Sequence, residues 1–216
     1  MKYGKILRTA LLLLLALFPL LFTSCVDYVQ AITYKDGKYQ MYYKVTFSKV
    51  LFALAEEDPE AVFESLDVEN LGEMPEDAYV RRVDTDLEVG AEFAFSIDPR
   101  TTVEEEKDFL PKTRGGKCYI PFMLGQEDYD FSDVMAGEDA DTTAMAQAML
   151  SSAKCRIFLN KEAFPQVTAA YFAGRAGQDY AIPVYDYGDD YCLEVPFITL
   201  FERDSYRLDR IVVLQE

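Results

Sequence analysis

The sequence predicts an α+β fold in which antiparallel sheet predominates and a few short helices pack on one side. Three observations lead to this prediction. Two pairs of alternating apolar segments in the first half of the chain are arranged as hairpins. Short helical segments follow the first hairpin, and a series of strand-like segments fills the second half of the chain.

The first hairpin is the clearest local signal. Segments 31–35 and 38–43 flank Asp36-Gly37, and this dipeptide favours a type I′ turn because both turn positions need a positive φ. In that register Lys35 pairs with Lys38, and strand alternation divides the hairpin into two faces. We expect the following residues to face the core: Tyr28, Ile32, Tyr34, Tyr39, Met41, Tyr43, Val45 and Phe47.

Two helices and a second hairpin are predicted next. Ser48 is a helix cap for residues 49–57, and Asp58 with the following proline starts another helix that ends near residue 66. Segments 79–83 and 87–97 form the second hairpin. Its longer strand alternates, with these apolar residues on the core side: Leu87, Val89, Ala91, Phe93, Phe95 and Ile97.

The second half of the chain reads as strands after a boundary or long loop at 98–116, which is rich in proline, glycine and acid. A short helix is expected at 142–150. Strands are expected at 118–124, 154–159, 166–172, 180–186, 191–201 and 210–214. The predicted organisation is a signal segment at 1–24, a hairpin–helix–hairpin unit at 25–98, and a strand-rich unit at 117–216 packed with it as one compact domain.

The start of the chain has the pattern of an export signal. Lys2, Lys5 and Arg8 precede an apolar run over 9–22, which is shorter than the ~20 residues of a membrane-spanning helix. The run ends at Leu21-Phe22-Thr23-Ser24-Cys25, which resembles the lipobox of bacterial lipoproteins processed by signal peptidase II. A plain secretory signal or an uncleaved anchor is the alternative.

The lipobox resemblance implies a location and a covalent modification. Residues 1–24 would be removed, and Cys25 would carry diacylglycerol on its sulfur and a further acyl chain, such as palmitate, on its amine. Two or more acyl chains hold a protein firmly on a membrane. The expected location is therefore the bacterial cell envelope, with the domain outside the cytoplasm.

Residues 28–97 resemble the LppM-like lipoprotein domain. The likeness consists of a hairpin with an Asp-Gly turn directly after the lipidated cysteine, followed by a helix and a second hairpin; here these are 28–47, 48–66 and 79–97. The resemblance implies an envelope lipoprotein that binds rather than catalyses, with no active site to transfer.

Composition excludes some classes of function. The net charge of −17 repels nucleic acid, so no nucleic-acid partner is expected. Histidine is absent, which removes the usual general base, zinc ligand and triad member. We therefore predict a protein that is not an enzyme. Cys118, Cys155 and Cys192 show no CxxC spacing and lie in apolar runs, which favours buried free thiols over a disulfide.

Candidate binding residues are few. Tyr42, on the outer side of the first hairpin, and Tyr187, in a turn, are the best candidates for an interaction surface, because tyrosine is enriched at interfaces. Asp186, Asp189 and Asp190 surround a glycine and are a candidate cation site, although aspartate–glycine turn chemistry explains them as well.

An acidic stretch is a weaker candidate for binding Ca²⁺: Glu127, Asp128, Asp130, Asp133, Glu138, Asp139 and Asp141. Its spacing does not match an EF-hand, so we expect a solvated loop and no cofactor other than the covalent lipid.

Three functions remain open at this point. The first is a lipid-anchored, non-catalytic envelope protein that binds a partner protein or an envelope component. The second is a carrier of lipid or another apolar ligand, which would need a dry pocket. The third is a carboxylate-based enzyme acting on glycans, which would need paired carboxylates across a cleft.

Overall fold

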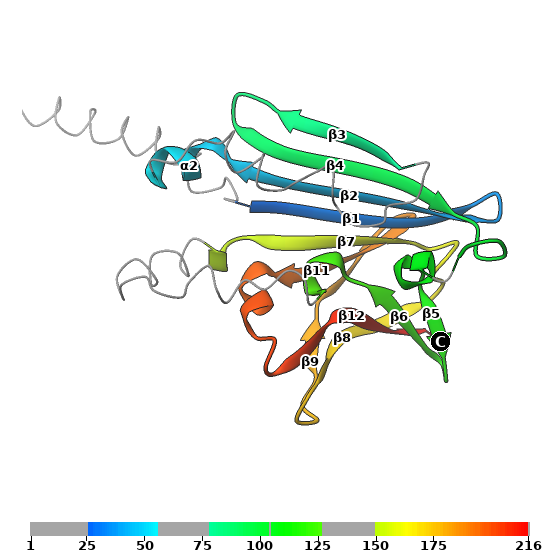
Figure 1. Cartoon of the computed structure of the whole chain (residues 1–216). Coiled ribbons are helices and arrows are strands. Elements are labelled where there is room, and N and C mark those ends of the chain that lie inside the picture. Colours follow the sequence, from blue (N-terminus) through cyan, green and yellow to red (C-terminus); the bar gives the residue numbers. More distant parts are fainter. Residues whose placement is uncertain (1–25, 56–77, 104, 127–149, 216) are drawn as a thin grey trace, which may run out of the picture.

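The computed structural model describes residues 26–55, 78–103, 105–126 and 150–215. Over these ranges the chain forms twelve strands in two sheets, which lie face to face (Figure 1). Sheet A has seven strands in the order β10-β11-β7-β1-β2-β4-β3, and sheet B has five in the order β5-β6-β12-β8-β9.

The two predicted hairpins form one half of sheet A. Antiparallel pairing links β1 to β2, β2 to β4 and β4 to β3. The strands are β1 (Val26–Lys35), β2 (Lys38–Ser48), β3 (Tyr79–Asp84) and β4 (Glu88–Ile97).

The C-terminal part of the chain completes sheet A. Strand β7 pairs in parallel with β1, placing Lys154 beside Asp27, and β11 and β10 follow in antiparallel order. These strands are β7 (Lys154–Asn160), β10 (Val184–Tyr187) and β11 (Asp190–Pro196). The N-terminal and C-terminal segments therefore share one sheet.

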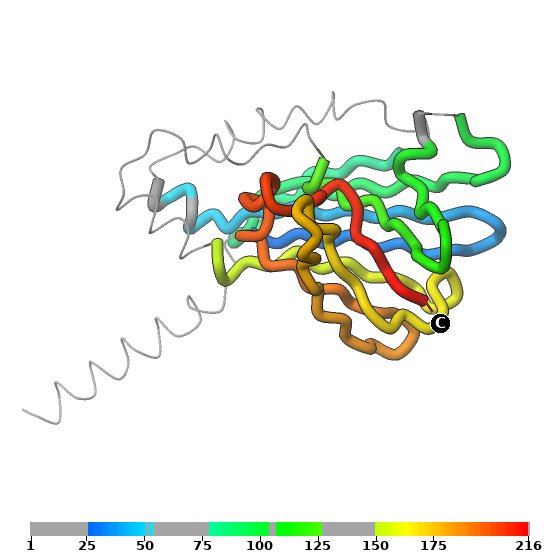
Figure 2. The backbone as a smooth tube through the Cα atoms, turned by 90° about the horizontal axis from the view of Figure 1, so that it is seen from below, coloured from blue at the N-terminus to red at the C-terminus, as the bar shows by residue number. Residues whose placement is uncertain are grey.

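Sheet B is built entirely from the second half of the chain, with β12 at its centre. Its strands are β5 (Lys112–Arg114), β6 (Lys117–Pro121), β8 (Val167–Gly174), β9 (Tyr180–Ile182) and β12 (Tyr206–Gln215). Figure 2 shows β8 and β12 crossing the strands of sheet A at an angle. Only Pro183 separates β9 from β10, so the chain passes directly from one sheet to the other.

The core lies between the two sheets. Alternation places Tyr28, Ile157 and Leu193 of sheet A on the side that faces Ile120 and Phe172 of sheet B, and all five are fully buried. Aromatic rings connect the layers: the centroids of Tyr28 and Phe122 are 5.7 Å apart in an edge-to-face arrangement. This is the favoured geometry for aromatic pairs in a core.

The Asp36-Gly37 turn sets the register as predicted. Asp36 and Gly37 have φ values of 54° and 82°, and Lys35 pairs with Lys38. Of the expected core residues of this hairpin, Tyr28, Ile32, Met41 and Tyr43 are buried. The remainder lie partly exposed or, at the hairpin tip, exposed: Tyr34, Tyr39, Val45 and Phe47.

The α+β prediction is wrong: the protein is mostly β, and the inner face of sheet A is covered by sheet B rather than by helices. The longest helix of the described residues is α2 (Lys49–Ala55), seven residues long, whose predicted cap is present because the Ser48 hydroxyl accepts from the Val50 amide at 3.3 Å. Residues 150–151 are also helical, and the other helical elements of the described residues are short 3₁₀ turns: η3 (Glu105–Phe109), η4 (Met123–Gly125) and η6 (Phe197–Phe201). The helix predicted at 58–66 and nearly all of that at 142–150 lie outside the described residues.

Prolines explain two further differences from the predicted strands. The strand expected at 180–186 is divided at Pro183, whose carbonyl accepts from the Glu194 amide. The strand expected at 191–201 ends at Pro196 and continues as η6.

Leu87, predicted on the core side, is 65% exposed because it lies in the β3–β4 turn.

Candidate binding face

The face of sheet A that points away from sheet B, called the outer face below, carries the most organised set of side chains outside the core. One row of directly paired residues crosses all seven strands. In an antiparallel or parallel pair, partner residues lie on the same side of the sheet. The row, called the aromatic row below, is Tyr79, Ala94, Tyr42, Ala31, Phe158, Cys192 and Tyr185.

Large and small side chains alternate along this row from strand to strand. Tyr79, Tyr42, Phe158 and Tyr185 come from β3, β2, β7 and β10, and the strands between them contribute alanine or cysteine. The end members are exposed, with 54% of Tyr79 and 43% of Tyr185 accessible, whereas Tyr42 and Phe158 are half-buried. The outer face is therefore ridged, with aromatic rings on every second strand.

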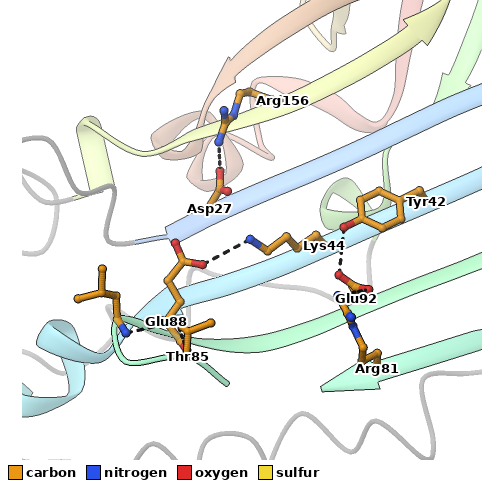
Figure 3. Close-up of polar contacts among 9 residues, drawn as sticks. Asp27, Tyr42, Lys44, Arg81, Thr85, Glu88, Glu92 and Arg156 are labelled. Carbon is orange, nitrogen blue, oxygen red and sulfur yellow. Dashed lines mark hydrogen bonds and ion pairs between the residues drawn. The ribbon is translucent and has the colours of Figure 1, made fainter. Parts of the chain in front are cut away.

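Four ion pairs lie beside the aromatic row, each joining two neighbouring strands. Figure 3 shows three of them, including Lys44 with Glu88 at 3.4 Å and Arg81 with Glu92 at 2.8 Å. The complete set is Lys44–Glu88, Arg81–Glu92, Lys154–Glu194 and Arg156–Asp27. Each cation has its own carboxylate, so these charges cancel on this face.

Tyr42 is held by one of these pairs. Its hydroxyl donates to Glu92 Oε2 at 3.2 Å, while Arg81 contacts the other carboxylate oxygen (Figure 3). Partial burial, followed by the nearby Glu92 charge and this hydrogen bond, raises the pKa of Tyr42. The same carboxylate raises the pKa of Arg81 through its hydrogen bond. Tyr42 is thus a neutral, oriented hydrogen-bond donor.

A shallow hollow of about 400 Å³ lies in the outer face next to Tyr42. Small residues leave it open, because Ala31 and Ala94 flank Tyr42 on the neighbouring strands. Polar side chains border it: the Thr33 hydroxyl lies 3.4 Å from Gln40 Oε1, and Ser96 pairs with Gln40 from β4. The hollow combines an aromatic edge with amide and hydroxyl groups.

Tyr42 and Tyr187, the two tyrosines selected from the sequence, both belong to sheet A. Tyr42 is on the outer side of the first hairpin, opposite Ala31. Tyr187 is 61% exposed and pairs with Asp190 at the β10–β11 turn, two residues beyond Tyr185 of the aromatic row.

The three candidate cation ligands do not converge. Asp186 pairs with Lys161 at 2.7 Å and accepts from the Gly188 amide at 3.2 Å; the Lys161 hydrogen bond lowers the pKa of Asp186. Asp190 accepts from the Asn160 amide group at 3.1 Å, and Asp189 contributes its carbonyl to Lys161. Across the described ranges no group of three or more acidic or cysteine side chains is placed to hold a metal.

The three cysteines lie on strands β6, β7 and β11. Cys118, Cys155 and Cys192 are free and buried, as the sequence suggested, and burial raises the pKa of each thiol. Cys25 and the acidic stretch 127–141 lie outside the described residues.

One buried polar residue was not identified from the sequence. Gln30 is fully buried on the inner face, where it accepts from the Tyr28 hydroxyl at 2.9 Å and donates to the Pro121 carbonyl of sheet B at 2.7 Å. Strand alternation could have identified it, because Gln30 lies two residues from both Tyr28 and Ile32 and therefore faces the same inner side. Phe158 and Tyr185 were also missed, because no local pattern in the sequence places them beside Tyr42.

No protein-family model, curated protein or solved structure matches this chain. Among the residues that the structure describes, no helix has the length and apolar character needed to cross a bilayer.

Proposed function

We propose that this protein is a lipid-anchored lipoprotein of the bacterial cell envelope, without catalytic activity, whose β domain binds a component found outside the cytoplasm. The outer face of sheet A is the observation that carries the proposal. It presents exposed aromatic rings in an ordered row, beside ion pairs that leave no net charge, on a chain whose overall charge is −17.

Aromatic side chains give large contact areas at little cost in conformational entropy, which makes them common at recognition surfaces. The paired charges matter equally, since an unpaired charge would have to be desolvated when a ligand covered it. A row of this kind is suited to binding, because it offers exposed aromatic contact area beside charges that are already paired.

The export signal and lipobox support the anchoring part of the proposal. β1 begins at Val26, directly after Cys25, so lipid on Cys25 would hold sheet A close to the membrane surface. No cofactor beyond the lipid is proposed, and the likeness of 28–97 to the LppM-like domain is part of the same proposal.

The anchor is tested by the intact mass of the chain extracted from membranes, with Cys25→Ala as the matched variant. A chain that starts at Cys25 and carries two or three acyl chains, lost in the variant, supports the proposal. Thiol titration in denaturant is a second readout: Cys118, Cys155 and Cys192 are free, so three thiols are expected when the Cys25 sulfur is acylated and four when it is not.

The binding part is tested by cross-linking in intact cells, comparing the wild-type chain with Tyr79→Ala. Loss of cross-linked products in this variant supports a function of the outer face. An unmodified chain cleaved elsewhere, together with unchanged cross-linking, would contradict the proposal.

A further inference from the structure

We propose that the aromatic row is a binding site for an extended, uncharged β-1,4-linked glycan, which lies across the strands and stacks its sugar rings on alternate strands. This inference rests on the proposed function, since it names the chemical class of the envelope component that the outer face binds.

The spacing of the rings is the first argument. Neighbouring strands lie about 4.8 Å apart, so aromatic residues on every second strand recur at about 9.6 Å. An extended β-1,4-linked glycan turns the same sugar face in the same direction at every second unit, and one disaccharide spans nearly this distance. Tyr79, Tyr42, Phe158 and Tyr185 therefore match four successive disaccharides.

The chemistry beside the rings is the second argument. A sugar has an apolar C–H face, which packs on an aromatic ring, and an edge of hydroxyl groups, which needs donors and acceptors. The hollow next to Tyr42 supplies such groups from Thr33, Gln40 and Ser96. Ala31 and Ala94 leave the space in which a sugar unit would lie between neighbouring ridges.

Charge is the third argument. Each of the four cations beside the row is matched by its own carboxylate on a neighbouring strand. The charges beside the row therefore cancel, and Lys35 and Lys38, two further cations on the outer side of the first hairpin, lie at its tip. The surroundings of the row therefore suit an uncharged ligand. The remainder of the chain accounts for the strongly acidic balance.

Sheet twist favours a chain-like ligand over a flat one. Neighbouring strands rotate by about 20–25°, so successive aromatic residues of the row rotate by about 45°. A rigid planar molecule would contact two of them at most. A glycan follows the row, because each glycosidic linkage allows rotation, and its affinity should increase with its length.

The test is calorimetric titration of the full chain, in a detergent without a sugar headgroup, with β-1,4-linked N-acetylglucosamine di-, tetra-, hexa- and octasaccharides. The matching β-1,4-linked glucose series distinguishes glycans with and without N-acetyl groups. We expect Kd to fall at each increase in length. Lack of binding by the hexasaccharides of both series would overturn the proposal.

The variants Tyr79→Ala and Tyr185→Ala address the row directly, and both positions are exposed, so folding is retained. An octasaccharide spans all four rings, so loss of one end ring should weaken its binding about threefold to tenfold. Tyr79→Phe keeps the ring and should bind like the wild type. Tyr34→Ala is the matched control, an exposed tyrosine of β1 that is not in the row.

The outcomes separate this inference from the proposed function. Octasaccharide binding that Tyr79→Ala and Tyr185→Ala leave unchanged would overturn the inference. Loss of a cross-linked protein partner in these variants, without any glycan binding, would overturn the inference and leave the binding function standing. Glycan binding by a membrane-extracted chain whose intact mass shows no acyl groups would support the inference and contradict the lipid anchor.

Discussion

The two faces of sheet A come from the same strands, yet they are organised by different rules. On the inner face, Tyr43 is buried and stacks on Phe93 and Phe95, whose ring centroids lie 5.0 and 5.9 Å away. On the outer face, Tyr42 stands between alanines of the neighbouring strands. Burial between the sheets accounts for the inner arrangement, whereas the outer row ends in two exposed rings, Tyr79 and Tyr185. The outer order is therefore the better guide to function.

The largest expected difference between the faces concerns two consecutive residues. Tyr43→Ala removes a fully buried ring and should lower the free energy of unfolding by about 3–5 kcal/mol, as large-to-small core substitutions do. Tyr42→Ala should cost about 1 kcal/mol or less, since only cross-strand contacts are lost. Urea unfolding followed by circular dichroism measures both. Similar losses for the two variants would contradict the comparison.

The next effect is at the buried amide between the sheets. Gln30→Met removes the hydrogen bonds to Tyr28 and to the Pro121 carbonyl, and should cost about 1–3 kcal/mol of the free energy of unfolding. Tyr28→Phe alone should cost less, and the double variant should show non-additive losses. Additive losses in urea unfolding would mean that the two groups do not act as one unit.

The inner and outer faces also differ in how well the sequence predicts them. Local rules sufficed for the first hairpin, because the Asp36-Gly37 turn permits only one register and alternation then assigns each face. They did not reveal what covers the inner face. A helix and a second sheet bury an apolar strand face equally well, and β7 joins β1 from more than a hundred residues away.

The candidate site shows the same limit. Tyr42 was identifiable, because its place on the outer side depends only on one hairpin. The aromatic row depends on six separate strand pairings, so Phe158 and Tyr185 could be placed beside Tyr42 only once those registers were known. The sequence also did not reveal the contacts of the β10–β11 aspartates: Asp186 pairs with Lys161 and accepts from the Gly188 amide, and Asp190 accepts from Asn160.

A smaller effect is expected from the ion pairs of the outer face. Lys44→Met breaks the pair with Glu88 and should change the free energy of unfolding by about 0.2–1 kcal/mol, because both side chains are partly solvated. The difference between variant and wild type should shrink in high salt, which screens exposed charges. A salt-independent loss, measured by urea unfolding at two ionic strengths, would indicate packing instead.

The smallest expected effect on stability concerns the ion pair of Asp98 and Arg100, which lies just beyond the end of β4 and away from both faces of sheet A. The Arg100 guanidinium lowers the pKa of Asp98 to about 2, through a hydrogen bond of 2.8 Å. A lowered carboxyl pKa contributes stability above the unfolded-state value of about 3.9, and this contribution is lost as the pH falls toward 2. Carboxyl NMR titration should show the Asp98 midpoint rise in Arg100→Gln. An unchanged midpoint would exclude the guanidinium as the cause.

The start of β1 next to Cys25 has a mechanical consequence. β1 lies between β2 and β7, with ten paired residues on one side and six on the other. If Cys25 is lipidated, a force between the membrane and a bound glycan is applied at the N-terminal end of β1 and acts along the axis of this strand. The ladder hydrogen bonds on both sides are then sheared together rather than opened one after another. The protein would thus resist forced extension best in the direction in which its tether is loaded.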